Sequence, residues 1–414
     1  MKVQNLTGTR DFYPDLQREI NYIFSNWRKV AISFGYEEME GPLIEPTDLW
    51  TLKSGDELSG QMYNFTDKGG RSVAVRPELT PTVARMVAQK QKELSKPIKW
   101  FSMGRFWRYE RPQAGRLREF FQFNLDCLGV ESMRADAEVI ASAISIMEGF
   151  GLDERDFYVR LCNRRLIQDL LLQFVGKEKL QEVCRLIDKK DKLRKGDFEL
   201  SLKDLGVERV EELVDFINEN DLQNIDYQEL TLEGKKGYTE LVELVKYLKN
   251  YGYEKYVKVD FSIMRGLDYY TSTVFEIFDR TGEFRAVAGG GRYDDLVSIF
   301  GGEKCPGIGY GMGDVVLGLF LKAKGKMPKL EKDVEYFVVV IGEVYEDALR
   351  VVKRLRSEGK NVEIAVSDLN TQKQLNYAQK VNAKNLIFVG EEELKRGKFK
   401  VKNVYSGKES FWSF

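Results

Sequence analysis

Residues 100–128 read WFSMGRFWRYERPQAGRLREFFQFNLDCL, and this stretch decides the fold of the chain. Apolar and polar residues alternate with a period of two on either side of a polar loop, which predicts a long antiparallel hairpin. The apolar face of its second strand should lie against the core, and consists of Phe121, Phe123, Leu125 and Cys127. The opposite face is predicted to be exposed, and carries Phe120, Gln122, Asn124 and Asp126.

The first strand of the hairpin carries Arg108 and Glu110 on one face, opposite the polar side chains of the second strand. Arg108 therefore adds a cation to this face. A guanidinium group suits a phosphate or a carboxylate, since its planar fork makes two parallel charge-assisted hydrogen bonds. A solvated sheet face with surface ion pairs would produce the same pattern. The hairpin alone therefore leaves a ligand site and a solvated surface both open.

Outward from the hairpin, the sequence predicts a long helix that ends at Gly35 and then an extended segment closed by Pro46. The periodicity is helical over about 164–250 and strand-like on both sides, so a helical insertion interrupts an antiparallel sheet. A lysine-rich linker is expected over 323–333. Short apolar strands alternate with helices beyond it, which predicts a first domain over 1–322 and a small α/β domain over 334–414.

Glycine occupies every second position of PGIGYGMGD, residues 306–314. In a strand this removes the side chains from one face, which costs stability and fits a flat ligand lying against the backbone. For the nearby AGGGRY, residues 288–293, a loose turn without any ligand would also explain the glycines. In RGLDYY, residues 265–270, the two tyrosines of a strand would point to opposite faces, so at most one should line a site.

Composition excludes several kinds of chemistry. The chain has 414 residues, a formal net charge of −1 and no histidine, so a histidine base, nucleophile or metal ligand is impossible. Its four cysteines are far apart, which argues against a zinc site or a disulfide framework and favours a reducing cytoplasm. No apolar run is long enough for a membrane span and the first residues lack a secretory signal, so we expect a cytoplasmic protein without a membrane partner.

Together these stretches resemble the landmarks of the histidyl-tRNA synthetases, in the same order and over nearly the whole chain. The landmarks are GTRDFYP (8–14), VRPELT (75–80), FSMGRFWRYERPQAGRLREFFQF (101–123), RGLDYYTSTVFE (265–276) and AGGGRYDDLV (288–297). The resemblance implies an α+β catalytic domain with an antiparallel sheet of about six strands, the class II synthetase fold, carrying the helical insertion. It also implies a C-terminal α/β anticodon-binding domain, a homodimer, and tRNA(His), L-histidine and ATP as partners.

The resemblance also implies a histidine site, made of Glu78, Leu79, Thr80, Gln122, Asp126, Tyr269 and Tyr270. Glu78 and Thr80, with Gln122, resemble the groups that hold the substrate α-ammonium. Asp126 and Tyr270 are similar to the pair that reads the imidazole ring.

The implied ATP site consists of Arg108, Glu110, Arg116, Phe120, Gly311 and Gly313. Arg108 resembles the arginine that grips the α-phosphate, and Phe120 the ring that stacks on adenine. Glu110 and Arg116 would contact the Mg²⁺-bound triphosphate, with Glu110 as the metal ligand. Arg265 looks like the family's own catalytic arginine.

Three departures from the family pattern stand out. Asp126 takes the place of a common glutamate, and Tyr109 and Phe121 take the places of common histidines. The usual arginine of the third motif falls on Val316, which neither pairs with phosphate nor stacks as a cation on adenine. The alternative is therefore a histidine-binding paralogue that regulates ATP phosphoribosyltransferase. Such paralogues usually lack the C-terminal domain and erode the motif residues that this chain retains, so the sequence favours the synthetase.

Overall fold

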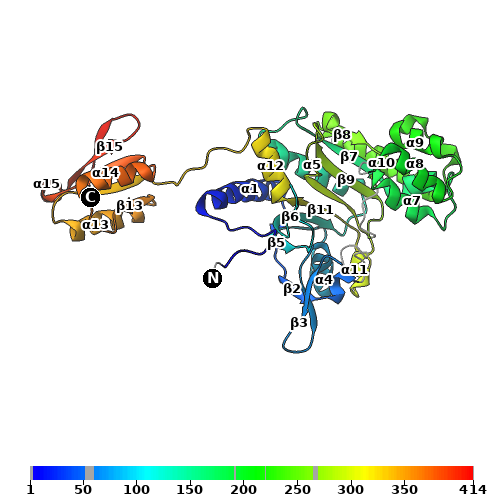
Figure 1. Cartoon of the computed structure of the whole chain (residues 1–414), viewed down its shortest axis with the longest axis horizontal. Helices are drawn as coiled ribbons and strands as arrows, with labels where there is room; N and C mark the ends of the chain where they lie inside the picture. Colours follow the sequence, from blue (N-terminus) through cyan, green and yellow to red (C-terminus); the bar gives the residue numbers. More distant parts are fainter. Residues whose placement is uncertain (1–2, 52–59, 191–192, 220, 264–268, 414) are drawn as a thin grey trace. The chain divides into compact units, whose positions relative to one another are not determined.

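The computed structural model describes residues 3–51, 60–190, 193–219, 221–263 and 269–413, and these form two compact units (Figure 1). The first unit comprises residues 1–328 and the second residues 329–414. Each has its own hydrophobic core.

An eight-stranded sheet is the centre of the first unit. In order across the sheet, its strands are β1 (Glu37–Glu38), β5 (Ile98–Trp107), β6 (Glu119–Leu128), β11 (Gly307–Gly313), β10 (Ala288–Arg292), β9 (Thr273–Asp279), β7 (Phe157–Asn163) and β8 (Val257–Val259). The six inner strands are antiparallel, whereas each edge strand pairs in parallel with its neighbour. The predicted hairpin is confirmed as β5 and β6, and the inner part of the sheet matches the implied six antiparallel strands.

The possible loose turn at 288–293 is in fact a buried central strand, β10. Its glycines are required by close packing, because a Cβ on Gly290 would lie 2.1 Å from the carbonyl oxygen of Gly309. Glycine runs usually indicate turns, but here they let two strands and the rings above them approach one another.

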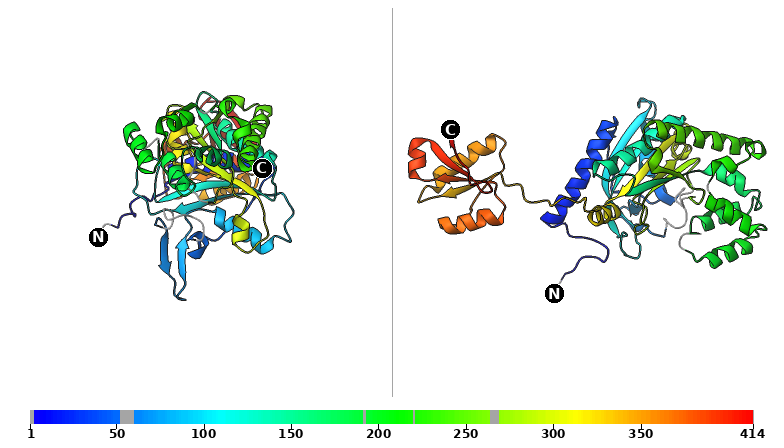
Figure 2. Two further views of the ribbon diagram at one scale, coloured as in Figure 1. Left: turned by 90° about the vertical axis from the view of Figure 1, so that its right-hand side faces the viewer. Right: turned by 90° about the horizontal axis from the view of Figure 1, so that it is seen from above.

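Three helices cover one face of this sheet: α1 (Pro14–Ser33), α5 (Met133–Gly149) and α12 (Asp314–Ala323). Figure 2 shows α1 lying along the sheet. The side chains of β11 that point toward these helices are fixed by them, since the Tyr310 hydroxyl lies 3.2 Å from that of Ser142 in α5 and the Trp27 indole N–H of α1 donates to the sulfur of Met312. The intervening glycines of β11 therefore face the opposite side of the sheet.

Beside this open face lies a small second sheet with an associated helix. The sheet contains β2 (Ile44–Pro46), β4 (Ser72–Val75) and β3 (Tyr63–Thr66), and α4 (Thr80–Lys90) follows β4. The segment between β4 and α4 carries Arg76, which donates to the carbonyl of Arg105 on β5. This bond helps to hold Glu78 and Thr80 close to the hairpin.

A group of helices follows β7 and occupies the far end of the unit, drawn in green in Figure 1. It consists of α6 (Arg164–Leu171), α7 (Leu180–Ile187), α8 (Lys195–Asp204), α9 (Val210–Glu219) and α10 (Leu232–Asn250). The helical periodicity predicted between two strands of the sheet is thus present, among the residues described between β7 and β8, as these five α-helices.

The second unit is a five-stranded sheet with helices on both faces. Its strands, in order, are β13 (Val362–Ile364), β12 (Tyr336–Val340), β14 (Asn385–Val389), β15 (Lys398–Asn403) and β16 (Glu409–Ser413). The helices are α13 (Tyr345–Ser357), α14 (Thr371–Lys380) and α15 (Glu391–Arg396). The first three strands are parallel, as alternating strands and helices predict. In neither unit does a helix of the described residues combine the length and apolar character needed to span a membrane.

Candidate active site

The polar face of β6 is buried, not exposed as the hairpin pattern predicted. Asn124 and Asp126 are each 4% exposed, whereas Phe120 and Gln122, nearer the loop, are half-buried. Tyr293, which is distant in the sequence, contacts Asp126, and the period-two pattern of one hairpin cannot predict such a contact. Exposure therefore increases along this face, which is closed at the Asp126 end and open to solvent at the Phe120 end.

The closed end contains two carboxylates and two tyrosines, which we name the buried carboxylate cluster: Glu78, Asp126, Tyr269 and Tyr293. The Tyr293 hydroxyl donates to Oδ1 of Asp126. The Tyr269 hydroxyl donates to Oε2 of Glu78 at 3.1 Å. The two tyrosine rings meet edge to face with their centroids 6.1 Å apart, so the two pairs form one assembly.

The pKa of Asp126 is raised to about 7, mainly by burial and to a smaller extent by the charge of Glu78, whereas the hydrogen bond from Tyr293 opposes the shift. Burial also raises the pKa of both tyrosines, which therefore stay protonated and act as donors. The cluster thus offers carboxylate oxygens, held by fixed hydroxyls, to a ligand that carries N–H groups.

The remaining residues of the predicted histidine site surround this cluster. Thr80 begins α4 and lies within hydrogen-bonding reach of Tyr269. Leu79 is 1% exposed and its side chain packs in the hydrophobic core, so only its backbone could face a ligand. Gln122 donates to Oδ1 of Asn124 at 2.6 Å, which orients its amide along β6.

Tyr269 and Tyr270 do not stand in a strand, as the expectation for this pair assumed. Both are buried and their ring centroids are 4.9 Å apart. The pair precedes β9 and is not part of it, so strand alternation does not apply. The Tyr270 ring lies against the backbone of β10, since a Cβ on Gly291 would come within 2.8 Å of it.

The alternating glycines of β11 make room mainly for the side chains of the site itself. A Cβ on Gly307 would lie 2.6 Å from the Tyr293 ring, and one on Gly309 would lie 2.1 Å from Oδ1 of Asp126. A Cβ on Gly311 would lie 2.6 Å from the amide nitrogen of Gln122. Only Gly313 has open space above it, because nothing lies within 4 Å of its Cβ position. The side chains of the site, rather than a flat ligand, therefore lie against β11 at these three glycines. Only Gly313 leaves room for a ligand beside the strand.

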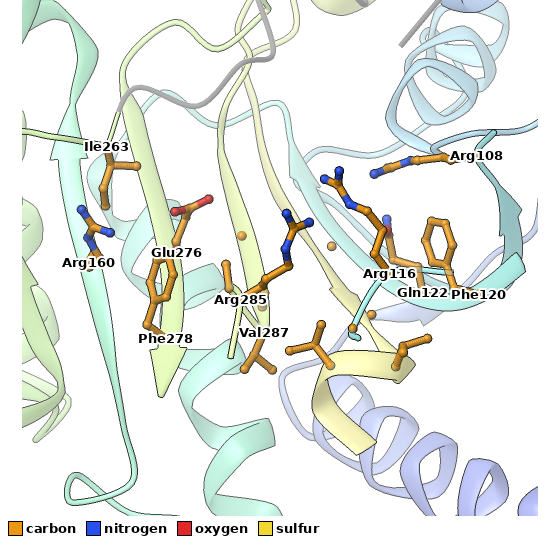
Figure 3. Close-up of a pocket in the computed structure, with 18 of the residues that line it drawn as sticks. Arg108, Arg116, Phe120, Gln122, Arg160, Ile263, Glu276, Phe278, Arg285 and Val287 are labelled. Carbon is orange, nitrogen blue, oxygen red and sulfur yellow. The ribbon is translucent and has the colours of Figure 1, made fainter. Parts of the chain in front are cut away.

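The open end of the same face is a pocket of about 420 Å³, within the range of roughly 300–1,000 Å³ typical of small-molecule sites. We name it the arginine pocket, after Arg108, Arg116 and Arg285 (Figure 3). Each of the six residues of the predicted ATP site lines it: Arg108, Glu110, Arg116, Phe120, Gly311 and Gly313. Gln122 also lines it, so the pocket continues toward the buried carboxylate cluster.

Arg108 is positioned at this pocket by two contacts. Its Nε donates to the carbonyl of Pro77 at 2.9 Å, and its guanidinium carbon lies 5.3 Å from the centroid of the Phe120 ring. The Phe120 ring in turn stacks on buried Phe106, with centroids 6.0 Å apart. One face of a guanidinium and one face of an aromatic ring are thus held at the pocket wall, which suits a ligand with a phosphate and a flat base.

Arg116 forms an ion pair with Glu110, whose side chain is only 6% exposed. Glu110 is the predicted Mg²⁺ ligand, and Mg²⁺ in such sites takes one or two protein carboxylates with phosphate oxygens and water. Among the described residues there is no cluster of three or more acidic or cysteine side chains that could hold a metal by themselves. One carboxylate beside the arginines of the pocket fits a metal that would be bound together with the phosphates of the nucleotide.

Sequence reasoning missed Tyr293 and Arg285, and one predicted residue cannot be placed. Arg265 lies outside the described residues. Tyr293 was assigned to a loose turn, although a tyrosine after three glycines could have indicated close packing of a ring on backbone. Arg285 had no signal in the sequence, because it lies outside every motif.

The sequence profile of the family described as histidyl-tRNA synthetase matches residues 8–313. The chain belongs to the histidyl-tRNA synthetase family. A second profile, that of the anticodon binding domain, matches residues 335–411 within the second unit. A histidine–tRNA ligase of Opitutus terrae is 39% identical over 416 residues, which cover 98% of this chain and 95% of that protein. The predicted membership of the family is thus confirmed.

Solved structures agree with this assignment at the level of the fold. The histidyl-tRNA synthetase of Nostoc sp. PCC 7120 has a TM-score of 0.83 at 24% identity, over 100% of this chain and 97% of that chain. A structure from Bacillus halodurans, described as an ATP phosphoribosyltransferase regulatory subunit/histidyl-tRNA synthetase, has a TM-score of 0.78 at 22% identity, over 94% of this chain and 98% of that chain. The predicted synthetase fold is confirmed, and the fold alone does not separate a ligase from a regulatory subunit.

Val316, the departure from the family's third motif, lies in the arginine pocket. Its side chain is buried, and its Cγ2 lies 3.2 Å from the Cβ position of Gly115 in the loop that carries Arg116. Valine thus contributes an apolar contact at the place where the family usually has a cation.

Proposed function

We propose that the protein is a histidine–tRNA ligase, which activates L-histidine with ATP to histidyl-adenylate and transfers the histidyl group to tRNA(His). The observation that supports this most is the continuity of the two halves of the site along β6. Asp126 of the buried carboxylate cluster and Gln122 of the arginine pocket are four residues apart on one face, about 13 Å along the strand. An amino acid bound at one and a nucleotide at the other would meet between them.

In this proposal the closed end recognises histidine. Ionised Asp126 accepts an N–H of the imidazole ring, and Tyr270 supplies a hydroxyl for the second ring nitrogen. Glu78 and Thr80, with Gln122, hold the α-ammonium group and so leave the carboxylate of the substrate directed toward the arginine pocket. Burial of these groups favours specificity, because an amino acid without matching N–H groups would leave a buried carboxylate unsatisfied.

The reaction then follows from the arrangement of charges. The histidine carboxylate attacks the α-phosphorus in line, a carboxylate–phosphorus bond forms, and pyrophosphate leaves with the electron pair of the broken P–O bond. Negative charge that develops on the non-bridging oxygens is stabilised by Arg108, and Phe120 positions the adenine. No protein nucleophile is needed, which agrees with a chain that has no histidine. In the second step the terminal ribose hydroxyl of tRNA(His) attacks the adenylate carbonyl and AMP leaves.

Several finer assignments belong to the same proposal. Glu110 would hold Mg²⁺, which neutralises charge on the triphosphate when it is bound. Residues 1–322 would form the catalytic core with an insertion at about 164–250, 323–333 the linker, and 334–414 the anticodon-binding domain. We further propose a cytoplasmic homodimer in which Arg265, assigned by resemblance alone, acts with Arg108 in catalysis.

The regulatory alternative is less well supported. A histidine-binding regulator would need the buried carboxylate cluster but not a nucleotide pocket. This chain retains Arg108, Glu110, Arg116 and Phe120 at one pocket, and a second unit that matches an anticodon binding domain.

The test is histidine-dependent exchange of pyrophosphate into ATP by the full-length protein, alongside Arg108→Ala and Arg265→Ala. We expect exchange with histidine alone among the amino acids, and a loss of about 100- to 1,000-fold in kcat in Arg108→Ala. Arg71→Ala is a matched control, because Arg71 is an exposed cation outside the pocket. Histidine binding without exchange in the wild type would contradict the ligase and favour the regulator.

A further inference from the structure

The arginine pocket holds a cation in a segment to which the family resemblance assigned no role. Arg285 lies between β9 and β10, and both it and Val287, two residues later, line the pocket. Figure 3 shows its guanidinium beside that of Arg116, with Arg108 and Phe120 on one side and Glu276 on the other. Arg285 therefore reaches the pocket from the wall opposite the hairpin.

The segment that carries Arg285 is firmly held. The carboxylate of Asp279, which is 1% exposed, accepts the backbone N–H groups of Glu283 and Phe284, each at 3.1 Å. The Phe284 ring packs on Phe320 of α12, with centroids 5.7 Å apart. The residue that precedes Arg285 is thus anchored on the helix that carries Val316.

Arg285 is not held by an ion pair within the described residues. None of the ion pairs found in the described parts of the chain includes Arg285, and the carboxylate of Glu110 is already paired with Arg116. Glu276 and Asp188 also line the pocket, and Arg160, opposite Glu276 on the neighbouring strand, forms an ion pair with Asp260 at 2.9 Å. Burial, followed by the charge of Arg116, lowers the pKa of Arg285, whereas the charge of Glu110 opposes this shift.

We propose that Arg285 binds the terminal phosphates of ATP beside Arg116 and so supplies the cation that Val316 cannot. The proposal rests on the assignment of the arginine pocket to ATP. A triphosphate carries its greatest charge at the β- and γ-phosphates, and two guanidinium groups from opposite walls can grip them with charge-assisted hydrogen bonds. Arg285 takes no part in bond making; it holds the leaving pyrophosphate in line with the attacking carboxylate.

The test compares wild type, Arg285→Ala, Arg285→Lys and the control Lys255→Ala, an exposed cation of the same unit that does not line the pocket. Calorimetry gives the Kd for ATP and for AMP, and pyrophosphate exchange gives KM for ATP and for histidine. In Arg285→Ala we expect the Kd and KM for ATP to rise about 10- to 100-fold, the loss expected for one charge-assisted contact. The Kd for AMP and the KM for histidine should change by less than about twofold, and Arg285→Lys should recover part of the ATP affinity.

An unchanged Kd for ATP in Arg285→Ala would overturn the proposal. So would equal weakening of ATP and AMP, because the arginine would then act on the adenosine moiety or on the structure. The Arg285→Lys variant keeps the charge and guards against a general loss of folding. The two proposals can fail separately. If the wild type showed no exchange but Arg285→Ala bound ATP more weakly and AMP with unchanged Kd, the ligase proposal would fail and the role of Arg285 would stand.

Discussion

The buried carboxylate cluster and the arginine pocket lie on the same face of one sheet, yet they hold their charges in opposite ways. In the cluster, Asp126 and Glu78 are almost completely buried, and tyrosine hydroxyls fix them before any ligand arrives. In the pocket, Arg116 is half-buried and paired with Glu110, whereas Arg285 is exposed and feels the charges of both. Buried charge is costly unless it is paired, so the closed end is suited to discrimination, whereas the open end is suited to binding a strongly charged ligand.

This contrast predicts that the two ends can be damaged separately. Changes in the buried carboxylate cluster should alter kcat/KM for histidine, and changes in the arginine pocket should alter KM for ATP. Four predictions test this contrast and the burial behind it, in order of expected size.

The largest effect is expected from adding one methyl group to β11. In Gly309→Ala the new Cβ would lie 2.1 Å from Oδ1 of Asp126 and would displace the carboxylate, so kcat/KM for histidine should fall about 100-fold. In Gly313→Ala the same atom meets open space, and the histidine parameters should be unchanged. Pyrophosphate exchange at varied histidine is the measurement, with calorimetric binding of ATP as the check that Gly309→Ala is folded. Equal histidine kinetics in the two variants would contradict the role of Asp126.

A smaller effect is expected from pH, because the ionised form of Asp126 accepts an N–H from the substrate much more strongly than the protonated form. Its pKa of about 7 implies that the ionised fraction, and with it kcat/KM for histidine, falls about tenfold between pH 8 and pH 6. Asp126→Asn keeps the titration of the substrate but not that of Asp126, so the difference between the two pH profiles isolates the residue. Parallel profiles in wild type and variant would show that Asp126 does not titrate in this range.

The same shift predicts a dependence of stability on pH. The pKa of Asp126 is raised in the folded state, so the unfolded chain ionises first, near pH 4, and the folded chain only near pH 7. Relative to Asp126→Asn, the wild type should therefore lose stability as the pH rises from about 4 to about 7, and change no further above it. Thermal unfolding of both proteins across this range measures the difference.

Salt should produce the smallest effect and should act on the open end alone. Screening weakens interactions of solvent-exposed charges, so KM for ATP should rise about threefold between about 0.05 and 0.5 M KCl. KM for histidine should stay within error, because the cluster is shielded from ions by burial. A histidine KM that rises in parallel with that of ATP would mean that the two ends are not as different as their exposure suggests.

Much of this site could be predicted from the sequence, because strand alternation is a local property. The period of two along β6 correctly placed Gln122, Asn124 and Asp126 on one face, and Arg108 and Phe120 line one pocket as the resemblance implied. Glycine at every second position of β11 correctly indicated a face without side chains. These inferences need only the geometry of one strand and its neighbour.

The failures have a common physical cause, since each depends on a contact between distant parts of the chain. Asp126 was predicted to be exposed because nothing near it in the sequence covers it, and Tyr293 is 167 residues away. Tyr269 and Tyr270 were assigned opposite faces because their strand was expected to begin earlier than Thr273. Arg285 was missed because an arginine in a connecting segment carries no pattern.

The sequence by itself determined the family, the two-unit organisation of the fold and which residues of each strand share a face, because motifs and periodicities are written along the chain. The order of the eight strands determined the rest. It brings β6, β11 and β10 side by side, so that Tyr293 closes over Asp126. The segment after β9 places Arg285 at the same pocket as Val316, which carries no charge. Burial and charge balance depend on neighbours in space, and only the tertiary structure decides which neighbours those are.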